Sequence, residues 1–454
     1  MVTIYFDKQF FSYLFNAKEK KFSVLREKIL AHKGEFIFLY SNAHILDLQR
    51  DNTKIKYEEM EFMQSIVDGN HIMYETPNVL VAKLAPRLVF DNIDKLDNIS
   101  WLEEFDTSKL SKEQSRVINN VMDVSIKDLS KQLDYDWLTK RTPIDTDKLM
   151  VNKETFVLFV KFFVSQFYGN NQFYKKIRND SISMYNPAGV TADGGTDFDK
   201  ELLSSPLKLS FIDTVDVLLK QMGLDSSDVS MVYYVSYMLL DMLGVSKEPQ
   251  RKIKFHNLQV DSCHSFYGSY CDCLVSDDSG LREKSKELYK LFNRSTQVYS
   301  IDEFIEKFDE AISNNQKSAK EYFDEIQSDY AARQIIKTET NSAGTWTHLN
   351  TNHKYFGYFN HMVERESKEG KVTILYKSND TNQPLLMREI EIVVNRLVTV
   401  FNDMGAKFSL FDPQQEWPLI KEDQWNRILE LDDVYMCLTK VAKEPRLCFW
   451  IKLK

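Results

Sequence analysis

Short apolar runs alternate with amphipathic segments in two separate parts of the chain. Residues 2–6 and 35–40 are apolar runs that favour β-strands, and Ser41 follows the second run in the position of a helix N-cap. The second part predicts a strand at 270–275, a helix at 280–292, a strand at 297–300 and a helix from 302. Because strands alternate with helices, the pattern predicts an α/β domain with a parallel sheet flanked by helices, made of residues 1–50 and 255–308.

The long interval between these two parts has mainly the period of a helix. Apolar residues return every three or four positions in the segments 56–67, 112–133, 154–168, 211–222 and 228–243. Residues 179–199 are rich in Gly, Asn, Asp and Ser and predict a long loop. The pattern therefore predicts a large helical insertion, residues 51–254, within the sheet domain.

The remainder of the chain contains segments with the pattern of a helix and segments with the pattern of a strand. A helical connector is predicted at 309–337 and a polar loop at 338–352. Strands at 371–377 and 407–411, a helix at 384–404 and a terminal hairpin of strands 433–440 and 446–452 follow. We interpret residues 338–454 as an α+β accessory domain.

Composition limits the classes of protein that remain. The chain has 454 residues, of which 43% are hydrophobic, enough for two or three domains. Its five cysteines fit a reducing cytoplasm better than a disulfide framework, and we expect neither a secretion signal nor contact with a membrane. The net charge of −9 argues against a protein that binds nucleic acid over its whole surface.

Acidic residues follow the predicted strands. Asp7 ends the first strand, and Asp277 and Asp278 end the strand 270–275. Asp47 and Asp261 lie in helices next to the same sheet edge. Because ligands bind at the carboxyl ends of parallel strands, we expect these carboxylates to converge there. Several carboxylates at short distance need a cation or protons, and hard oxygen ligands suit Mg²⁺ or Mn²⁺.

The order of these motifs resembles the PIN-like nuclease family. The resemblance rests on IYFD, ending at Asp7, on YSNAHILD, ending at Asp47, and on VDSCH followed by CLVSDDSGL. It implies that Asp7, Asp47, Asp261 and Asp278 are catalytic and metal-binding, with Asp277 as a fifth metal-binding candidate. The chain has Lys8 where this family usually has a small polar residue, and the interval 49–260 is unusually long.

The resemblance implies a metal-dependent nuclease that hydrolyses phosphodiester bonds with a metal-activated water. The resemblance favours RNA as the substrate, and single-stranded regions enter a carboxylate cleft most easily. A regulatory partner or a second copy of the chain could bind the insertion or the accessory domain. The substrate-binding candidates near the acidic positions are Lys8, Ser41, His44, His264 and Ser276, together with the basic residues Arg251, Lys252 and Lys254.

Other interpretations stay open. Lys8 could replace a metal ion beside Asp7, which would leave a scaffold that binds nucleic acid or a partner protein without cutting it. Cys263, Cys271 and Cys273, with His256 and His264 nearby, lack the paired spacing typical of a zinc site. Aromatic and histidine residues between 346 and 361 could stack on bases, although such residues also form ordinary cores.

Overall fold

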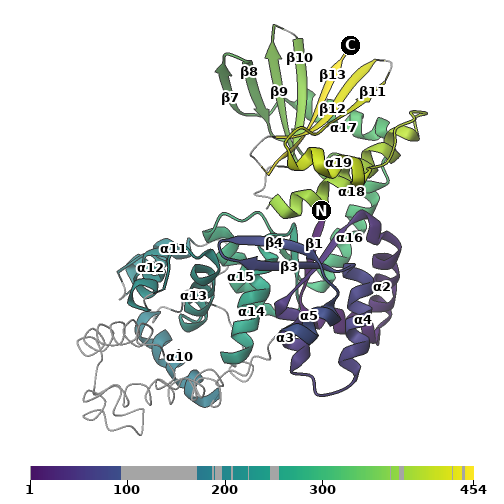
Figure 1. Ribbon diagram of the computed structural model, residues 1–454. Helices are drawn as coiled ribbons and strands as arrows, with labels where there is room; N and C mark the ends of the chain where they lie inside the picture. The colour runs from purple at the N-terminus through teal and green to yellow at the C-terminus, as the bar shows by residue number, and fades with distance from the viewer. Residues whose placement is uncertain are drawn as a thin grey trace, which may run out of the picture.

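The computed structural model describes residues 2–93, 171–245 and 255–454, apart from short gaps at 187–188, 190–196, 206–207, 223, 369, 378–382, 432 and 442–444. Two sheets organise these residues (Figure 1), one of six strands and one of seven. The first sheet contains parallel strands flanked by helices, which confirms the α/β class. The helices predicted at 112–133 and 154–168 lie outside the described residues.

The six-stranded sheet joins the two separated parts of the chain. Its order is β4-β3-β2-β1-β5-β6, and every neighbouring pair is parallel except β3 and β4. Strand β1 pairs with β5, with Phe6 opposite Val275, so the two parts share one sheet as expected. The strands are β1 Thr3–Phe6, β2 Ile37–Ser41, β3 Asn70–Glu75, β4 Asn78–Lys83, β5 Cys273–Val275 and β6 Gln297–Tyr299.

Helices cover both faces of this sheet, which explains why its central strands are apolar throughout. Ile4 and Phe6 of β1 belong to one buried cluster, whereas Tyr5 belongs to the other. Helices α1, α2, α4 and α16 supply the first cluster, and α14 and α15 supply part of the second. The helical segments are α1 Lys8–Asn16, α2 Lys20–His32, η1 Lys33–Glu35, α3 Asn42–Gln49, α4 Ile55–Val67, α5 Pro86–Asn92, α14 Phe255–Gly268, α15 Ser279–Leu291 and α16 Ile301–Asn315.

The predicted start of the insertion at residue 51 does not agree with the structure. Strands β3 and β4 lie in residues 70–83 and extend the six-stranded sheet. Polar residues, among them Asn70 and His71, interrupt the alternation that is typical of a strand. The two strands are instead held by main-chain pairing to β2 and to each other. Residues 51–93 therefore belong to the sheet domain.

Helices do fill the described part of the interval after residue 170. Residues 179–185, predicted as loop, are the end of α10, where Ile182 packs against Gly244 and Arg178 pairs with buried Asp241. Helix α13 packs against α14 and α15 of the sheet domain. The segments are α10 Asn171–Tyr185, α11 Phe198–Glu201, η3 Leu202–Ser204, α12 Phe211–Met222 and α13 Val229–Met242.

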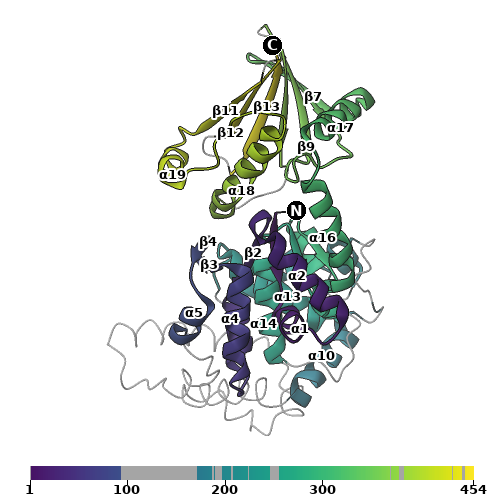
Figure 2. The ribbon, with the colours of Figure 1, turned by 90° about the vertical axis from the view of Figure 1, so that its right-hand side faces the viewer.

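The C-terminal part is a seven-stranded antiparallel sheet with order β11-β12-β13-β10-β9-β8-β7. Helices α17, α18 and α19 lie on one side of it (Figure 2). The predicted terminal hairpin is present as β12 and β13. The elements are α17 Ala319–Ala332, β7 Ile335–Asn341, β8 Gly344–Leu349, β9 His361–Ser367, β10 Gly370–Tyr376, α18 Gln383–Asn402, α19 Pro413–Lys421, β11 Asn426–Glu430, β12 Val434–Lys440 and β13 Leu447–Leu453.

Two predictions for this part are wrong, whereas the connector 309–337 is helical over the end of α16 and the whole of α17, up to Ala332. The polar loop 338–352 contains most of the hairpin of β7 and β8, whose first strand begins at Ile335 and is exposed along its whole length, so that it shows no apolar pattern. Residues 407–411 form no strand. Their main chain is held by helix α18 instead, because Asn402 accepts from Phe408 N at 2.8 Å and Asn395 accepts from Phe411 N at 2.8 Å.

A buried charge network connects the two sheets. The Lys377 ammonium, just after β10, lies 2.6 Å from Asp272 Oδ1 at the start of β5 and 2.6 Å from Glu389 Oε1 of α18. Asp272 Oδ2 also accepts from Val2 N at 2.5 Å. The side chains of Lys377 and Glu389 are 5% and 1% exposed, so the charges depend on one another for solvation.

Candidate functional site

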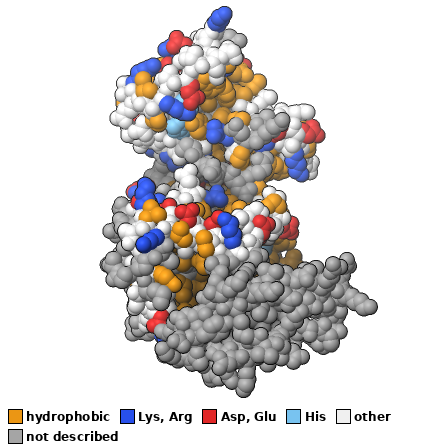
Figure 3. All heavy atoms as spheres, turned by 90° about the vertical axis from the view of Figure 1, so that its left-hand side faces the viewer, with side chains coloured by type: hydrophobic (Ala, Val, Ile, Leu, Met, Phe, Trp, Pro, Cys, Tyr) orange, Lys and Arg blue, Asp and Glu red, His pale blue; other side chains and the backbone are white. Residues whose placement is uncertain are grey.

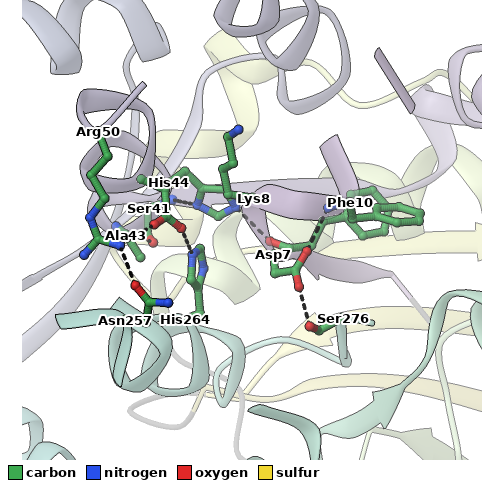
Figure 4. A network of polar contacts seen from close by, with 12 residues as sticks. Asp7, Lys8, Phe10, Ser41, Ala43, His44, Arg50, Asn257, His264 and Ser276 are labelled. Carbon is green, nitrogen blue, oxygen red and sulfur yellow. Dashed lines mark hydrogen bonds and ion pairs between the residues drawn. The ribbon is translucent and has the colours of Figure 1, made fainter. Parts of the chain in front are cut away.

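The adjacent ends of β1 and β5 bring two acidic residues, Asp7 and Asp278, to the same pocket. Figure 4 shows Asp7 between Phe10 and Ser276. Asp7 is the N-cap of α1 and accepts from Phe10 N at 2.8 Å. Asp278 is the N-cap of α15 and accepts from Leu281 N at 2.9 Å. Ser276 joins them, since its hydroxyl donates to Asp7 and accepts from Asp278 N at 3.0 Å.

Helices α3 and α14 supply the other two acidic residues. Asp47 of α3 accepts from His264 Nε2 and from Arg50 Nη1, each at 3.2 Å. Asp261 lies on α14 three residues before His264, so both side chains are on the same face of that helix. The contact between α3 and α14 therefore brings Asp47 and Asp261 to one place.

All four of these carboxylates line one open pocket of about 200 Å³. The expected convergence of Asp7, Asp47, Asp261 and Asp278 at the carboxyl edge of the sheet is thus present in the structure. Three basic side chains accompany the acids. The pocket is lined by Asp7, Lys8, Gln9, Asp47, Arg50, Asn257, Asp261, His264, Asp278 and Leu281.

Asp7 is electrostatically unlike an exposed carboxyl. Burial raises its pKa to about 6, although the hydrogen bond from Ser276 and the nearby His264 act in the opposite direction. Only 5% of the residue is exposed. Asp7 therefore carries a proton in mildly acidic solution and a negative charge above pH 6.

Behind the pocket lies a fully buried polar network. The Tyr5 hydroxyl is 2.6 Å from Ser41 Oγ and 3.0 Å from His264 Nδ1. His44 Nδ1 accepts from Ser41 N at 3.1 Å, and its Nε2 donates to Phe6 O at 2.7 Å. Burial lowers the pKa of His44 well below its usual value, so the ring is neutral. The network fixes the position of His264 and, through it, of Asp47.

This network corrects part of the predicted substrate-binding set. Ser41, His44 and Ser276 are 0% exposed and do not line the pocket. Ser41 does begin α3 as expected, but its hydroxyl serves as the cap and accepts from Ala43 N. Their burial argues against contact with substrate and indicates that these residues position the acidic side chains.

Two further candidates point away from the pocket centre. The Lys8 ammonium lies 3.1 Å from Glu59 of α4 and 2.9 Å from Ser12, so it does not neutralise Asp7. Asp277 is exposed and is 3.4 Å from Ile301 N at the start of α16. The structure thus argues against Asp277 as a fifth ligand. Arg251, Lys252 and Lys254 lie outside the described residues.

Sequence reasoning missed four residues of the pocket, Gln9, Arg50, Asn257 and Leu281. A helical spacing signal was present for two of them. Arg50 is three residues after Asp47, and Asn257 is four residues before Asp261, so each shares a helix face with a predicted acid. The Arg50 guanidinium also lies 3.5 Å from Asn257 Oδ1 and so connects the two helices across the pocket.

The donor atoms suit a hard cation, but they do not form a ready-made ligand shell. Among the described residues, no group of three or more His, Cys, Asp or Glu side chains is arranged to hold a metal ion. The cysteines and histidines considered for a zinc site therefore form no such group among these residues either. Burial raises the pKa of Cys263 to about 11 and that of Cys271 well above its usual value, so both thiols are protonated at neutral pH. The side chain of His256 is not described.

No family model, curated protein or solved structure matches this chain. Of the helices in the described part of the chain, none combines the length and the apolar composition that crossing a membrane requires.

Proposed function

We propose that the chain is a PIN-like, Mg²⁺- or Mn²⁺-dependent nuclease that hydrolyses phosphodiester bonds in single-stranded RNA. The observation that carries this proposal is the convergence of Asp7, Asp47, Asp261 and Asp278 on one pocket. These residues come from two parts of the chain more than 200 positions apart, and they meet at a sheet edge where ligands bind.

The chemistry of the donor set fits the proposed cations. Four carboxylates and the Asn257 amide face the same space, and Mg²⁺ and Mn²⁺ prefer oxygen ligands. Asp7, Asp47, Asp261 and Asp278 would hold the ion, which when bound would activate water and offset the negative charge of the phosphate. Because the described residues form no ready-made shell, side chains must move on binding.

The remaining residues have separate roles in this proposal. His264 orients Asp47 from behind and is itself held by Tyr5. Arg50 would exchange Asp47 for a phosphate oxygen, because a guanidinium suits both partners. The raised pKa of Asp7 means that a proton competes for this carboxylate below about pH 6.

The second candidate is a scaffold that binds nucleic acid or a partner protein without hydrolysis. The pairing of Asp47 with both Arg50 and His264 favours it, since protein groups already satisfy this carboxylate. The sequence argument for a scaffold relied on Lys8, but the ammonium of that residue is paired with Glu59. Cleavage assays distinguish the two candidates.

Purified protein is expected to cut labelled single-stranded RNA in the presence of Mg²⁺ or Mn²⁺, and EDTA should abolish cutting. Asp261→Asn keeps the side-chain volume and removes one charge, and we expect it to lower the cleavage rate by about 100-fold or more. Asp277→Asn is the matched control, because Asp277 is acidic, adjacent to Asp278 and outside the pocket. Its rate should stay within about twofold of the wild type.

Melting temperatures measured on both variants separate loss of chemistry from loss of fold. A wild type that binds RNA and DNA but cuts neither would support the scaffold. Equal cleavage by Asp261→Asn and wild type would contradict the assignment of the pocket.

A further inference from the structure

The seven-stranded sheet has one face that the described helices leave uncovered. Residues pointing to the helices, such as Leu375 and Phe449, join the large core with α18. The alternate residues form a separate small cluster around Val363, Ile374 and Cys448. Figure 3 shows hydrophobic side chains gathered on the upper part of the molecule, with basic and acidic side chains and a histidine beside them.

Flat rings surround that small cluster. We use the name aromatic face for Trp346, His348, His361, Tyr376 and Trp450, all of which are half-buried. The strand register places them side by side, since His361 is opposite Tyr376, and Val363 separates His348 from Ile374, whose other neighbour is Trp450. The indoles of Trp346 and Trp450 meet edge to face, with centroids 6.5 Å apart.

Arginines lie over two of these rings. The guanidinium of Arg365 is 5.3 Å from the centroid of Trp346, and that of Arg446 is 4.9 Å from the centroid of Tyr376. Arg365 donates to Ala343 O but has no carboxylate partner in the described part of the chain. Its positive charge is therefore available to an anion that reaches the face.

The two histidines add polar, uncharged rings. His348 and His361 approach to 3.4 Å between Nδ1 and Nε2. Burial is the main cause that lowers the pKa of each, so both are neutral at pH 7. Within the described residues, the indole N–H groups of Trp346 and Trp450 are buried without a hydrogen-bond partner.

We infer that the aromatic face is a binding platform for single-stranded nucleic acid. Bases stack on exposed aromatic rings whatever their sequence, and cations beside the rings pair with the phosphates. The uncovered sheet face has both features in one place, whereas the chain as a whole carries a net charge of −9. Binding here does not depend on hydrolysis at the carboxylate pocket.

Other occupants fit the observations less well. A peptide or a second copy that extended the sheet would add at the edge strand β7, where Ile335 and Ile336 are 53% and 57% exposed. The rings and Arg365 lie instead on the face, on β8, β9, β10 and β13, and Arg446 directly precedes β13. They are therefore arranged for a ligand that lies flat across several strands.

The test measures binding of the full-length protein to fluorescent oligomers of about 12 nucleotides, RNA and DNA, in EDTA so that no cutting occurs. Trp346→Leu keeps an apolar side chain but removes the stacking ring, and it should weaken binding roughly tenfold or more. Arg365→Gln should weaken binding and reduce the slope of log affinity against log salt by about 0.7, the value for one phosphate contact on a single strand.

A second arginine-over-ring pair provides the control. The guanidinium of Arg87 is 4.2 Å from the Tyr57 centroid, but Arg87 is paired with Asp91 and lies on the other sheet domain. Tyr57→Leu and Arg87→Gln should leave affinity and salt slope unchanged. Asp277→Asn, which lies outside the carboxylate pocket, should also bind like the wild type. Because the assay measures binding in EDTA and not cutting, a failure of the nuclease proposal remains distinguishable from a failure of this one.

Two results would overturn the inference. The first is a failure of binding: either the wild type binds neither RNA nor DNA, or the variants keep full affinity and an unchanged melting temperature. The second is a Trp346→Leu variant that binds the nucleic acids like the wild type but sediments with a different oligomeric state of the protein. That result would assign the face to a second copy of the chain. If Trp346→Leu lowers the melting temperature, Arg365→Gln decides the question through the salt slope.

Discussion

Replacing Lys377 by Met is expected to lower the free energy of unfolding by about 3–5 kcal/mol, because the substitution leaves two buried carboxylates without their cation. Burial opposes ionisation of Asp272, yet Lys377 and other nearby cationic groups hold its pKa well below the usual value. Burial raises the pKa of Glu389, and Lys377 offsets part of that rise. Chemical denaturation at pH 7 measures the loss.

The matched control is Lys371→Met on β10, the strand that ends directly before Lys377. Lys371 pairs with Glu364 and Glu366 at 3.6 and 3.7 Å, but its side chain is 54% exposed, so the change should cost less than about 1 kcal/mol. The triple variant Lys377→Met/Asp272→Asn/Glu389→Gln removes all three charges and should recover most of the stability. An equally small loss in Lys377→Met and Lys371→Met would contradict a buried network.

The pH dependence of the Lys377→Met deficit follows from the same charges. In the wild type, the lowered pKa of Asp272 contributes stability that is present above the unfolded pKa and is lost as pH falls through the folded one. Without the ammonium, the folded carboxyls bind protons more readily than the unfolded chain. The difference between variant and wild type should therefore narrow as pH falls from 7 toward 4.

The sequence predicted the elements that carry their own apolar signal. Residues 2–6 and 270–275 are mostly apolar because the strands within them, β1 and β5, are buried on both faces. The acidic residues after these runs located Asp7 and Asp278. The N-cap position of Ser41 was equally local, since the hydroxyl precedes its helix directly. Where the local residue pattern alone determines an element and its cap, a single sequence is sufficient to predict them.

Elements that depend on long-range contacts could not be predicted from local pattern. Strand β7 is exposed along its whole length, and β3 carries polar residues, so both are strands only because they pair with a neighbouring strand. The direction of Lys8 depends on Glu59, 51 positions away, and the burial of Ser276 depends on its contact with Asp7. The sequence thus supplied the acidic residues of the pocket but not the residues that position them.

Asp7→Asn is expected to raise the free energy of unfolding above pH 6 by about 3 kcal/mol, because each pKa unit corresponds to about 1.4 kcal/mol. The folded pKa of Asp7 is about 6, against an ordinary value of 3.8. Between these values the unfolded chain releases the proton and the folded chain keeps it, so the wild type loses stability as pH rises from about 4 to 6 and no further above it. The amide of the variant cannot ionise, and its oxygen can still accept from Phe10 N.

Asp7→Ala separates the charge from the cap. It also removes the carboxylate, so its stability relative to the wild type should change with pH as that of Asp7→Asn does, but it should lie about 1 kcal/mol lower throughout because α1 loses its N-cap. Denaturation curves at pH 4 and pH 7 for the three proteins provide the measurement. If the free energies of unfolding of Asp7→Asn and wild type differ by the same amount at both pH values, the pKa of Asp7 is not raised in the folded protein. A stability gain of Asp7→Asn at pH 7 but not at pH 4 would show that the buried charge of Asp7 destabilises the fold.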